Sequence, residues 1–249
     1  LNMMFDYITQ CMLTGSGAEP WKDQGEIKFL CPCPGYDRHF SIAQYYGIKL
    51  IPVDMTDYGP DMDAVEELIK DPKVKGMFCV PKYSNPTGVT YNPETVERIA
   101  KMKPAASDFR IIWDNAYIIH DLAEESDKLD NIFDVLKKYG NEDMVIEFTS
   151  TSKISFPGSG VAVLAASDKN IDMIISRMSI QTIGYDKLNQ FRHVKYYKDV
   201  RGIKNHMRLH RSILAPKFKA VINEFKTQLG GYGVATWTNP KGGYFISLD

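Results

Sequence analysis

The sequence lacks the features that mark membrane, secreted and nucleic-acid-binding proteins. No apolar run approaches the roughly 20 residues that a membrane-spanning helix needs, and no signal peptide opens the chain. The formal net charge is −1, so no strong field for nucleic acid or for an anionic membrane surface is implied. We therefore expect neither a nucleic acid nor a membrane as a partner.

Cysteine is scarce, with 4 residues in the chain. Cys31 and Cys33 are separated by a single proline, which is too close for the usual zinc-ligand spacing, and no second Cys/His pair completes such a site. Reduced thiols are the better interpretation. The sequence thus predicts a cytoplasmic protein without a metal site.

The composition is that of an ordinary globular protein, with 44% hydrophobic and 24% charged residues. A chain of 249 residues is long enough to bury a large core.

Both ends of the sequence look cut. Leu1 opens directly into an apolar helical pattern with neither a start methionine nor an N-cap residue. Residues 243–249 read as a strand that stops without a partner. We expect a piece of a longer protein, whose other residues would complete any site.

Strand and helix patterns alternate along residues 1–168. Apolar runs predict strands over 27–30, 49–53, 74–80, 110–113, 144–148 and 161–165. Helical spacing predicts helices over 3–13, 40–46, 62–70, 94–103 and 129–139. This alternation is typical of an α/β domain with a mainly parallel sheet, whose ligands lie beyond the carboxyl ends of the strands.

After about Asp168 the pattern changes to helices. One helix is predicted over 171–180, then a long helical stretch over 186–229 that is interrupted near Gly202 and Pro216. Its many basic residues read as a solvated helix face, because apolar residues recur among them at helical spacing. A strand pair follows over 237–249. We divide the chain into a large domain (1–168) and an interdomain helix with part of a smaller α+β domain (169–249).

One lysine stands among small hydroxyl residues after a predicted strand. Lys153 follows Ser150 and Ser152, and few of its neighbours are solvated. Burial disfavours an ammonium and lowers its pKa, and an amine made neutral in this way attacks carbonyl groups to form Schiff bases. A surface lysine in a Ser/Thr loop is the simpler alternative for this motif alone.

Polar residues also follow two other predicted strands. Asn85 lies in the Asn-Pro-Thr-Gly turn after strand 74–80, where its side chain can donate a hydrogen bond to a phenolate oxygen; the alternative is a plain turn. Asp114 ends strand 110–113, where a buried carboxylate needs a partner such as a protonated pyridine nitrogen. Tyr117 could reach the same ring. The alternative for Asp114 is a helix cap.

These motifs, in this order, resemble the fold-type I pyridoxal-phosphate enzymes, specifically the class I/II aminotransferases. The likeness extends over almost the whole chain. The segments around Tyr36, around Lys153 and over residues 241–249 are most similar to the Ic-type bacterial aspartate aminotransferases. The resemblance implies a three-layer sandwich with a mainly parallel sheet, the PLP-dependent transferase fold, as the large domain.

The resemblance also implies roles. Lys153 would hold pyridoxal 5′-phosphate through a Schiff base and later move the substrate proton. Asp114 would pair with the pyridine nitrogen, and Tyr117 and Asn85 would hydrogen-bond the ring oxygen. Tyr36 would stack on the ring. The phosphate would be bound by Ser150.

Two features of the pattern bear on the phosphate and on assembly. Most relatives have a phosphate-binding arginine where this chain has Val161, so a helix N-terminus and hydroxyls would have to replace it. The first phosphate-binding loop would lie just before Leu1, and the arginine for the substrate carboxylate beyond Asp249. Gln181-Thr182-Ile183 falls near a loop that reaches the neighbouring subunit's phosphate in relatives, which implies a homodimer with shared sites.

The expected reaction is ping-pong transfer of an amino group between an amino acid and a 2-oxo acid. Aspartate and 2-oxoglutarate are the substrates that the subgroup likeness implies. Two alternatives remain at this point. One is a different reaction with the same cofactor, such as a β-lyase or a racemase. The other is an effector domain of a transcriptional regulator that has the aminotransferase fold.

Overall fold

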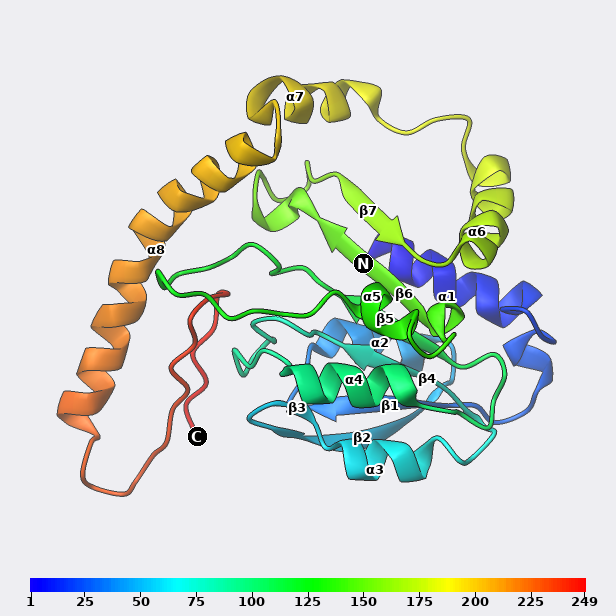
Figure 1. The fold of residues 1–249 in the computed structure, drawn as a ribbon, viewed down its shortest axis with the longest axis horizontal. Helices are drawn as coiled ribbons and strands as arrows, with labels where there is room; N and C mark the ends of the chain where they lie inside the picture. The colour runs from blue at the N-terminus through cyan, green and yellow to red at the C-terminus, as the bar shows by residue number, and fades with distance from the viewer.

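A seven-stranded sheet forms the centre of the molecule, which a computed structural model describes over residues 1–249 (Figure 1). The strand order is β3-β2-β1-β4-β5-β6-β7. The pairs among β1, β2, β4, β5 and β6 are parallel, whereas β3 and β7 run antiparallel to their neighbours. The strands are β1 (Lys28–Cys33), β2 (Lys49–Thr56), β3 (Gly59–Pro60), β4 (Val74–Cys79), β5 (Arg110–Asp114), β6 (Val145–Ser150) and β7 (Ala162–Ala165).

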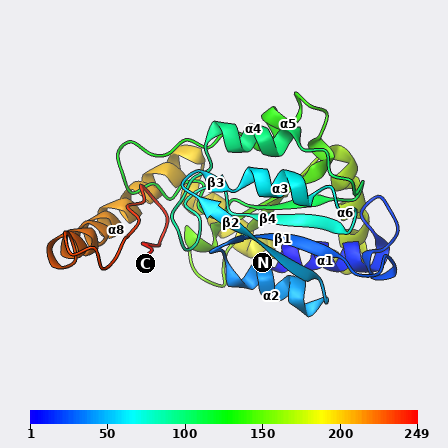
Figure 2. The same ribbon diagram turned by 90° about the horizontal axis from the view of Figure 1, so that it is seen from below.

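Helices cover both faces of this sheet (Figure 2). One face packs against α3 (Met62–Leu68), α4 (Pro93–Lys101) and α5 (Ile132–Leu136), and the other against α1 (Asn2–Thr14), α2 (Asp37–Tyr45) and α6 (Asp168–Gln181). Successive side chains of a strand point to opposite faces, so Met77 of β4 belongs to one apolar core and Phe78 to the other. The expected three-layer α/β sandwich is confirmed.

Short polar residues begin several of these helices. The Asp61 carboxylate accepts hydrogen bonds from the first turn of α3, and the Asn92 side chain does the same for α4, where Pro93 occupies the first helical position. Asn131 and Ser167 cap α5 and α6 in the same way. These caps fix the residue at which each helix begins. Single-turn 3₁₀ helices η1 (Trp21–Asp23), η2 (Glu142–Met144) and η3 (Thr151–Lys153) complete this part of the chain.

The helical C-terminal part differs from the expected pattern in where it breaks. The chain turns at Lys198, whose φ of 63° ends α7 (Lys187–Tyr197), and α8 (Val200–Gln228) starts at the Asp199 cap. Gly202 does not interrupt the helix, because its N–H donates a hydrogen bond to the capping Asp199 carboxylate at 2.8 Å. Pro216 also lies inside the continuous α8. None of the helices is long and apolar enough to cross a membrane.

The last residues fold back on the body as a narrow antiparallel pair, in red in Figure 1. Thr236 and Asp249 exchange two backbone hydrogen bonds, and a single bridge joins Trp237 to Leu248. We call residues 236–249 the C-terminal hairpin. The expected strand pair is therefore present, although short. The division into two domains near residue 168 stays a prediction.

Candidate active site

All six side chains that the sequence singles out line one cavity of about 440 Å³, which lies beyond the carboxyl ends of the central strands. Asn85 follows β4, Asp114 ends β5, and Ser150 ends β6. Because these strands are parallel neighbours, their carboxyl ends lie at one edge of the sheet. The cavity thus brings together Tyr36, Asn85, Asp114, Tyr117, Ser150 and Lys153.

The carboxylate of Asp114 is buried and has one protein partner. Its Oδ2 accepts a hydrogen bond from Nε2 of His39 at 2.9 Å, and its Oδ1 accepts none. The alternative reading of Asp114 as a helix cap is wrong, because no helix follows β5 and the Asn115 N–H donates to the Phe148 carbonyl instead. The open oxygen is suited to an N–H donor in the cavity.

His39 is a site residue that the sequence analysis did not assign. Its side chain is 1% exposed and stacks on Phe78, with 4.9 Å between the ring centroids. This packing keeps the imidazole in place for its hydrogen bond to Asp114. The signal that could have found it is its position three residues after Tyr36, in the first turn of α2, which begins where β1 leaves the sheet. The distance of 75 residues between His39 and Asp114 hides the contact from any local pattern.

Two tyrosines stand near Asp114. Burial and the negative charge of Asp114 raise the pKa of Tyr117 and that of Tyr36 above the usual value. Both phenols therefore keep their protons at neutral pH. Neither hydroxyl donates to a protein acceptor, so both can donate to a ligand in the cavity.

Lys153 differs from its expected environment. The sequence predicts a buried amine, whereas the structure shows an exposed residue. The reason is that β6 ends at Ser150 and η3 (Thr151–Lys153) takes the chain past the edge of the sheet. Its Nζ forms no ion pair or hydrogen bond within the protein, and lies 5.8 Å from the centroid of the Tyr244 ring. The amine is thus accessible to a carbonyl compound in the cavity.

Two serines and the start of a helix contribute to the lining of the cavity. Ser150 and Ser152 line it together with Leu1, Asn2 and Met3 at the start of α1. Gly160 packs so tightly that a Cβ would lie 2.2 Å from Oγ of Ser152. These groups suit an anion such as a phosphate.

Val161, where the family resemblance implies an arginine, has a structural task in this chain. Its N–H donates to Oγ1 of Thr151 at 2.8 Å, and its carbonyl accepts from the Thr151 N–H at 2.9 Å. These two hydrogen bonds hold the backbone at position 161 beside η3, the turn that carries Lys153. The residues of this chain that line the cavity include no arginine, so the phosphate-binding groups among them are hydroxyls and N–H groups.

The segment Gln181-Thr182-Ile183 is not part of the lining of this cavity; it comprises the last residue of α6 and the start of the loop to α7. Gln181 donates to the Asp6 carboxylate at 3.3 Å, and the Ile183 side chain is fully exposed. Its contact with a second subunit stays a prediction.

The donor set fits pyridoxal phosphate. An open carboxylate oxygen matches a protonated pyridine nitrogen, phenol and amide donors match the ring oxygen, and an accessible amine matches the aldehyde. Serine hydroxyls and a helix N-terminus match the phosphate. These features lie in one cavity of a size typical for small-molecule sites.

Comparisons with known proteins agree with this geometry. The family model described as "Aspartate amino-transferase" matches residues 1–249. An aspartate aminotransferase of Corynebacterium glutamicum is 45% identical over 251 residues, a match that covers 100% of this chain and 58% of that enzyme. The chain therefore spans little more than half the length of this relative.

Solved structures show the same similarity. The crystal structure of an aspartate transaminase from Corynebacterium glutamicum superposes with a TM-score of 0.97 at 45% identity, over 100% of this chain and 59% of that one. LysN, an α-aminoadipate aminotransferase of Thermus thermophilus crystallised with N-(5′-phosphopyridoxyl)-L-leucine, superposes with a TM-score of 0.80 at 21% identity, over 99% of this chain and 59% of that chain. At that lower identity the likeness concerns the fold alone.

Proposed function

We propose, from the premise that this chain belongs to the aspartate aminotransferase family, that its protein transfers amino groups between an amino acid and a 2-oxo acid with pyridoxal phosphate. The observation that supports this proposal is that one cavity is lined both by an accessible lysine, Lys153, and by a buried carboxylate with one open oxygen, Asp114. The cofactor, when bound, supplies a ring that withdraws electrons from the substrate Cα.

The chain's own residues divide the work in this proposal. Lys153 would hold the cofactor covalently, and its Nζ would afterwards take and return the proton at the substrate Cα. Asp114 would keep the pyridine nitrogen protonated, because a carboxylate nearby favours the charged form of a base. His39 keeps that carboxylate in place through its 2.9 Å hydrogen bond.

The remaining site residues bind and orient. Asn85 and Tyr117 donate hydrogen bonds to the ring oxygen, and the raised pKa of Tyr117 keeps its phenol protonated for this purpose. Tyr36 offers an aromatic face for stacking. Ser150 binds the phosphate, together with the start of α1.

Aspartate as amino donor and 2-oxoglutarate as acceptor are the substrates that we propose, in a ping-pong sequence. The support is the name of the relative that is 45% identical, an aspartate aminotransferase. No arginine lines the cavity, so the group that binds the second substrate carboxylate is not among the lining residues.

We also propose that the protein forms a homodimer with shared sites. A second domain would start near residue 168.

The test is an assay of the purified protein with aspartate and 2-oxoglutarate, followed by product analysis. We expect oxaloacetate and glutamate, and a visible cofactor band that aspartate bleaches. Lys153→Ala should lower the rate about 1,000-fold or more, whereas Lys137→Ala, at an exposed surface position, should not change it.

Three other results would count against this function. Release of ammonia would indicate a β-lyase, and D-aspartate would indicate a racemase. A visible band without turnover of any amino acid would favour an effector-sensing role.

A further inference from the structure

The carbonyl group of Lys153 receives two side-chain hydrogen bonds from distant parts of the chain. The Tyr244 hydroxyl donates to it at 3.0 Å, and Nε2 of His120 donates to it at 3.2 Å. A carbonyl oxygen has two lone pairs, so this acceptor is saturated. The backbone of the amine-bearing residue is therefore fixed by tertiary contacts rather than by its own short 3₁₀ turn.

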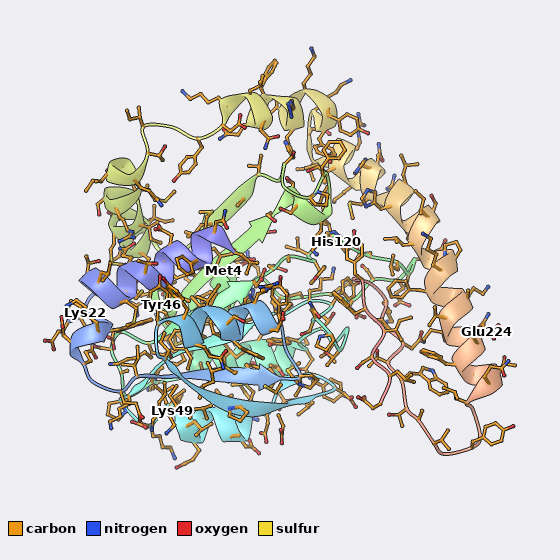
Figure 3. The ribbon with its side chains drawn as sticks, turned by 180° about the vertical axis from the view of Figure 1, so that it is seen from behind. Met4, Lys22, Tyr46, Lys49, His120 and Glu224 are labelled. Atoms are coloured by element: carbon orange, nitrogen blue, oxygen red, sulfur yellow. The ribbon has the colours of Figure 1, made fainter.

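The two donors are also tied to each other. The Gly243 N–H, next to Tyr244 in the C-terminal hairpin, donates to the His120 carbonyl at 2.9 Å. A neighbouring glycine, Gly242, packs on the ring of Tyr83 so closely that a Cβ would lie 2.1 Å from it. His120 thus lies between the sheet and the returning hairpin (Figure 3). The three hydrogen bonds form a closed ring that joins Lys153, His120 and the hairpin.

The state of His120 suits a permanent donor. The Lys153 carbonyl can only accept, so the imidazole proton is on Nε2. The residue is 3% exposed, and its Nδ1 is buried with no partner. Burial lowers the pKa of His120 to about 4, so the ring stays neutral at physiological pH.

The ring of Tyr244 also faces the reactive end of the lysine. Its centroid lies 5.8 Å from Nζ of Lys153 and 6.1 Å from the ring of Tyr117. The same side chain therefore holds the backbone of Lys153 and borders the space in which its amine moves.

We propose that Tyr244 and His120 form a two-donor clamp that positions Lys153 for covalent capture of the cofactor aldehyde. The clamp makes the C-terminal hairpin a part of the site, because it supplies one donor and orients the other. This inference rests on the proposed function, in which the Lys153 amine condenses with the aldehyde and releases water. Tyr244 and His120 are positioning residues, since they act through the backbone of Lys153.

The experiment measures capture rather than turnover. Cofactor-free protein is mixed with pyridoxal phosphate, the visible band is followed in time, and the product is reduced with borohydride and located by peptide mass. Tyr244→Phe and His120→Leu should each slow capture at Lys153 a few-fold, and the double variant about tenfold or more. His120→Gln keeps a donor at the Nε2 position and should restore most of the rate.

Controls separate positioning from general damage. Pyridoxamine phosphate has no aldehyde, so its affinity should be the same in all variants if only the lysine is displaced. Tyr232→Phe, at a tyrosine that is 74% exposed, should have no effect. An unchanged capture rate in the double variant would overturn the clamp. So would a parallel loss of pyridoxamine phosphate affinity and thermal midpoint, since that pattern indicates a structural role only. Wild-type protein that forms no bond at Lys153 would instead reject the proposed function.

Discussion

Strand β5 has an aspartate at each end, and the two carboxylates differ in how completely the protein satisfies them. Asp108, just before the strand, accepts from Lys75 at 2.7 Å and from Trp21 and Gln24 at 2.9 Å each. Asp114, at the carboxyl end, accepts only from His39. Both are buried. A saturated buried carboxylate anchors the fold, whereas a buried carboxylate with an open oxygen beside a cavity is available to a ligand.

The two nearby lysines repeat this contrast. Lys75 is 7% exposed and its amine ends on Asp108. Lys153 is exposed, and its amine has no hydrogen-bond partner in the protein. Burial by itself therefore does not separate the groups that we propose as reactive from the structural ones. Incomplete pairing at the carboxyl ends of the strands does.

The largest effect is expected on the free energy of unfolding when Asp108, before strand β5, is replaced. Asp108→Asn leaves the Lys75 ammonium buried without a counter-charge, so the free energy of unfolding should fall by about 3–5 kcal/mol. Urea unfolding at pH 7 measures this, with Asp130→Asn at an exposed position as the control. A loss below about 1 kcal/mol would show that Asp108 is not the anchor that its three contacts indicate.

The matching substitution at Asp114, at the other end of β5, should lower the rate of amino transfer rather than the stability. Asp114→Asn keeps an acceptor for His39 but removes the charge, so amino transfer should fall about 100-fold, as when one preorganised electrostatic contact is lost. Its unfolding free energy should change by less than about 1 kcal/mol. If stability fell as in Asp108→Asn while the rate stayed constant, the contrast between the two ends would be wrong.

A smaller effect is expected at His39. His39→Leu removes the one hydrogen bond to Asp114, and a hydrogen bond to a charged group contributes roughly 1.5–3 kcal/mol, so the rate should fall about tenfold. His39→Gln retains a donor and should recover part of the loss. Steady-state kinetics of both variants test this. Equal rates for the two would mean that the imidazole does not act through this hydrogen bond.

The smallest effect concerns acid stability. Burial raises the pKa of Asp108, but the hydrogen bonds from Lys75 and Gln24 outweigh it, so the pKa is lowered. The unfolded-state pKa is about 3.9. The ionised carboxylate therefore stabilises the fold above that pH, and this contribution is lost as the pH falls from about 4 through the lowered value.

The difference in unfolding free energy between wild type and Asp108→Asn should accordingly shrink below pH 4. Urea titrations at pH 7, 5, 4 and 3 measure it. A difference that stays constant down to pH 3 would contradict the lowered pKa.

Much of this site follows from sequence because its main residues stand at strand ends. Asn85, Asp114 and Ser150 each come after an apolar run, and parallel pairing brings such ends to one edge. The helix boundary at residue 198 did not follow, since the turn depends on a positive φ at Lys198 rather than on Gly202 or Pro216.

By itself, the sequence determined the alternation of strands and helices, and with it the group of polar residues at one edge, because hydrophobic period and strand ends are local properties. The tertiary structure alone decided which of these groups are paired. The His39–Asp114 contact spans 75 positions and the Tyr244–Lys153 contact 91. Whether Lys153 is buried or open, and what holds it, depends on segments that meet only when the sheet and the C-terminal hairpin are in place.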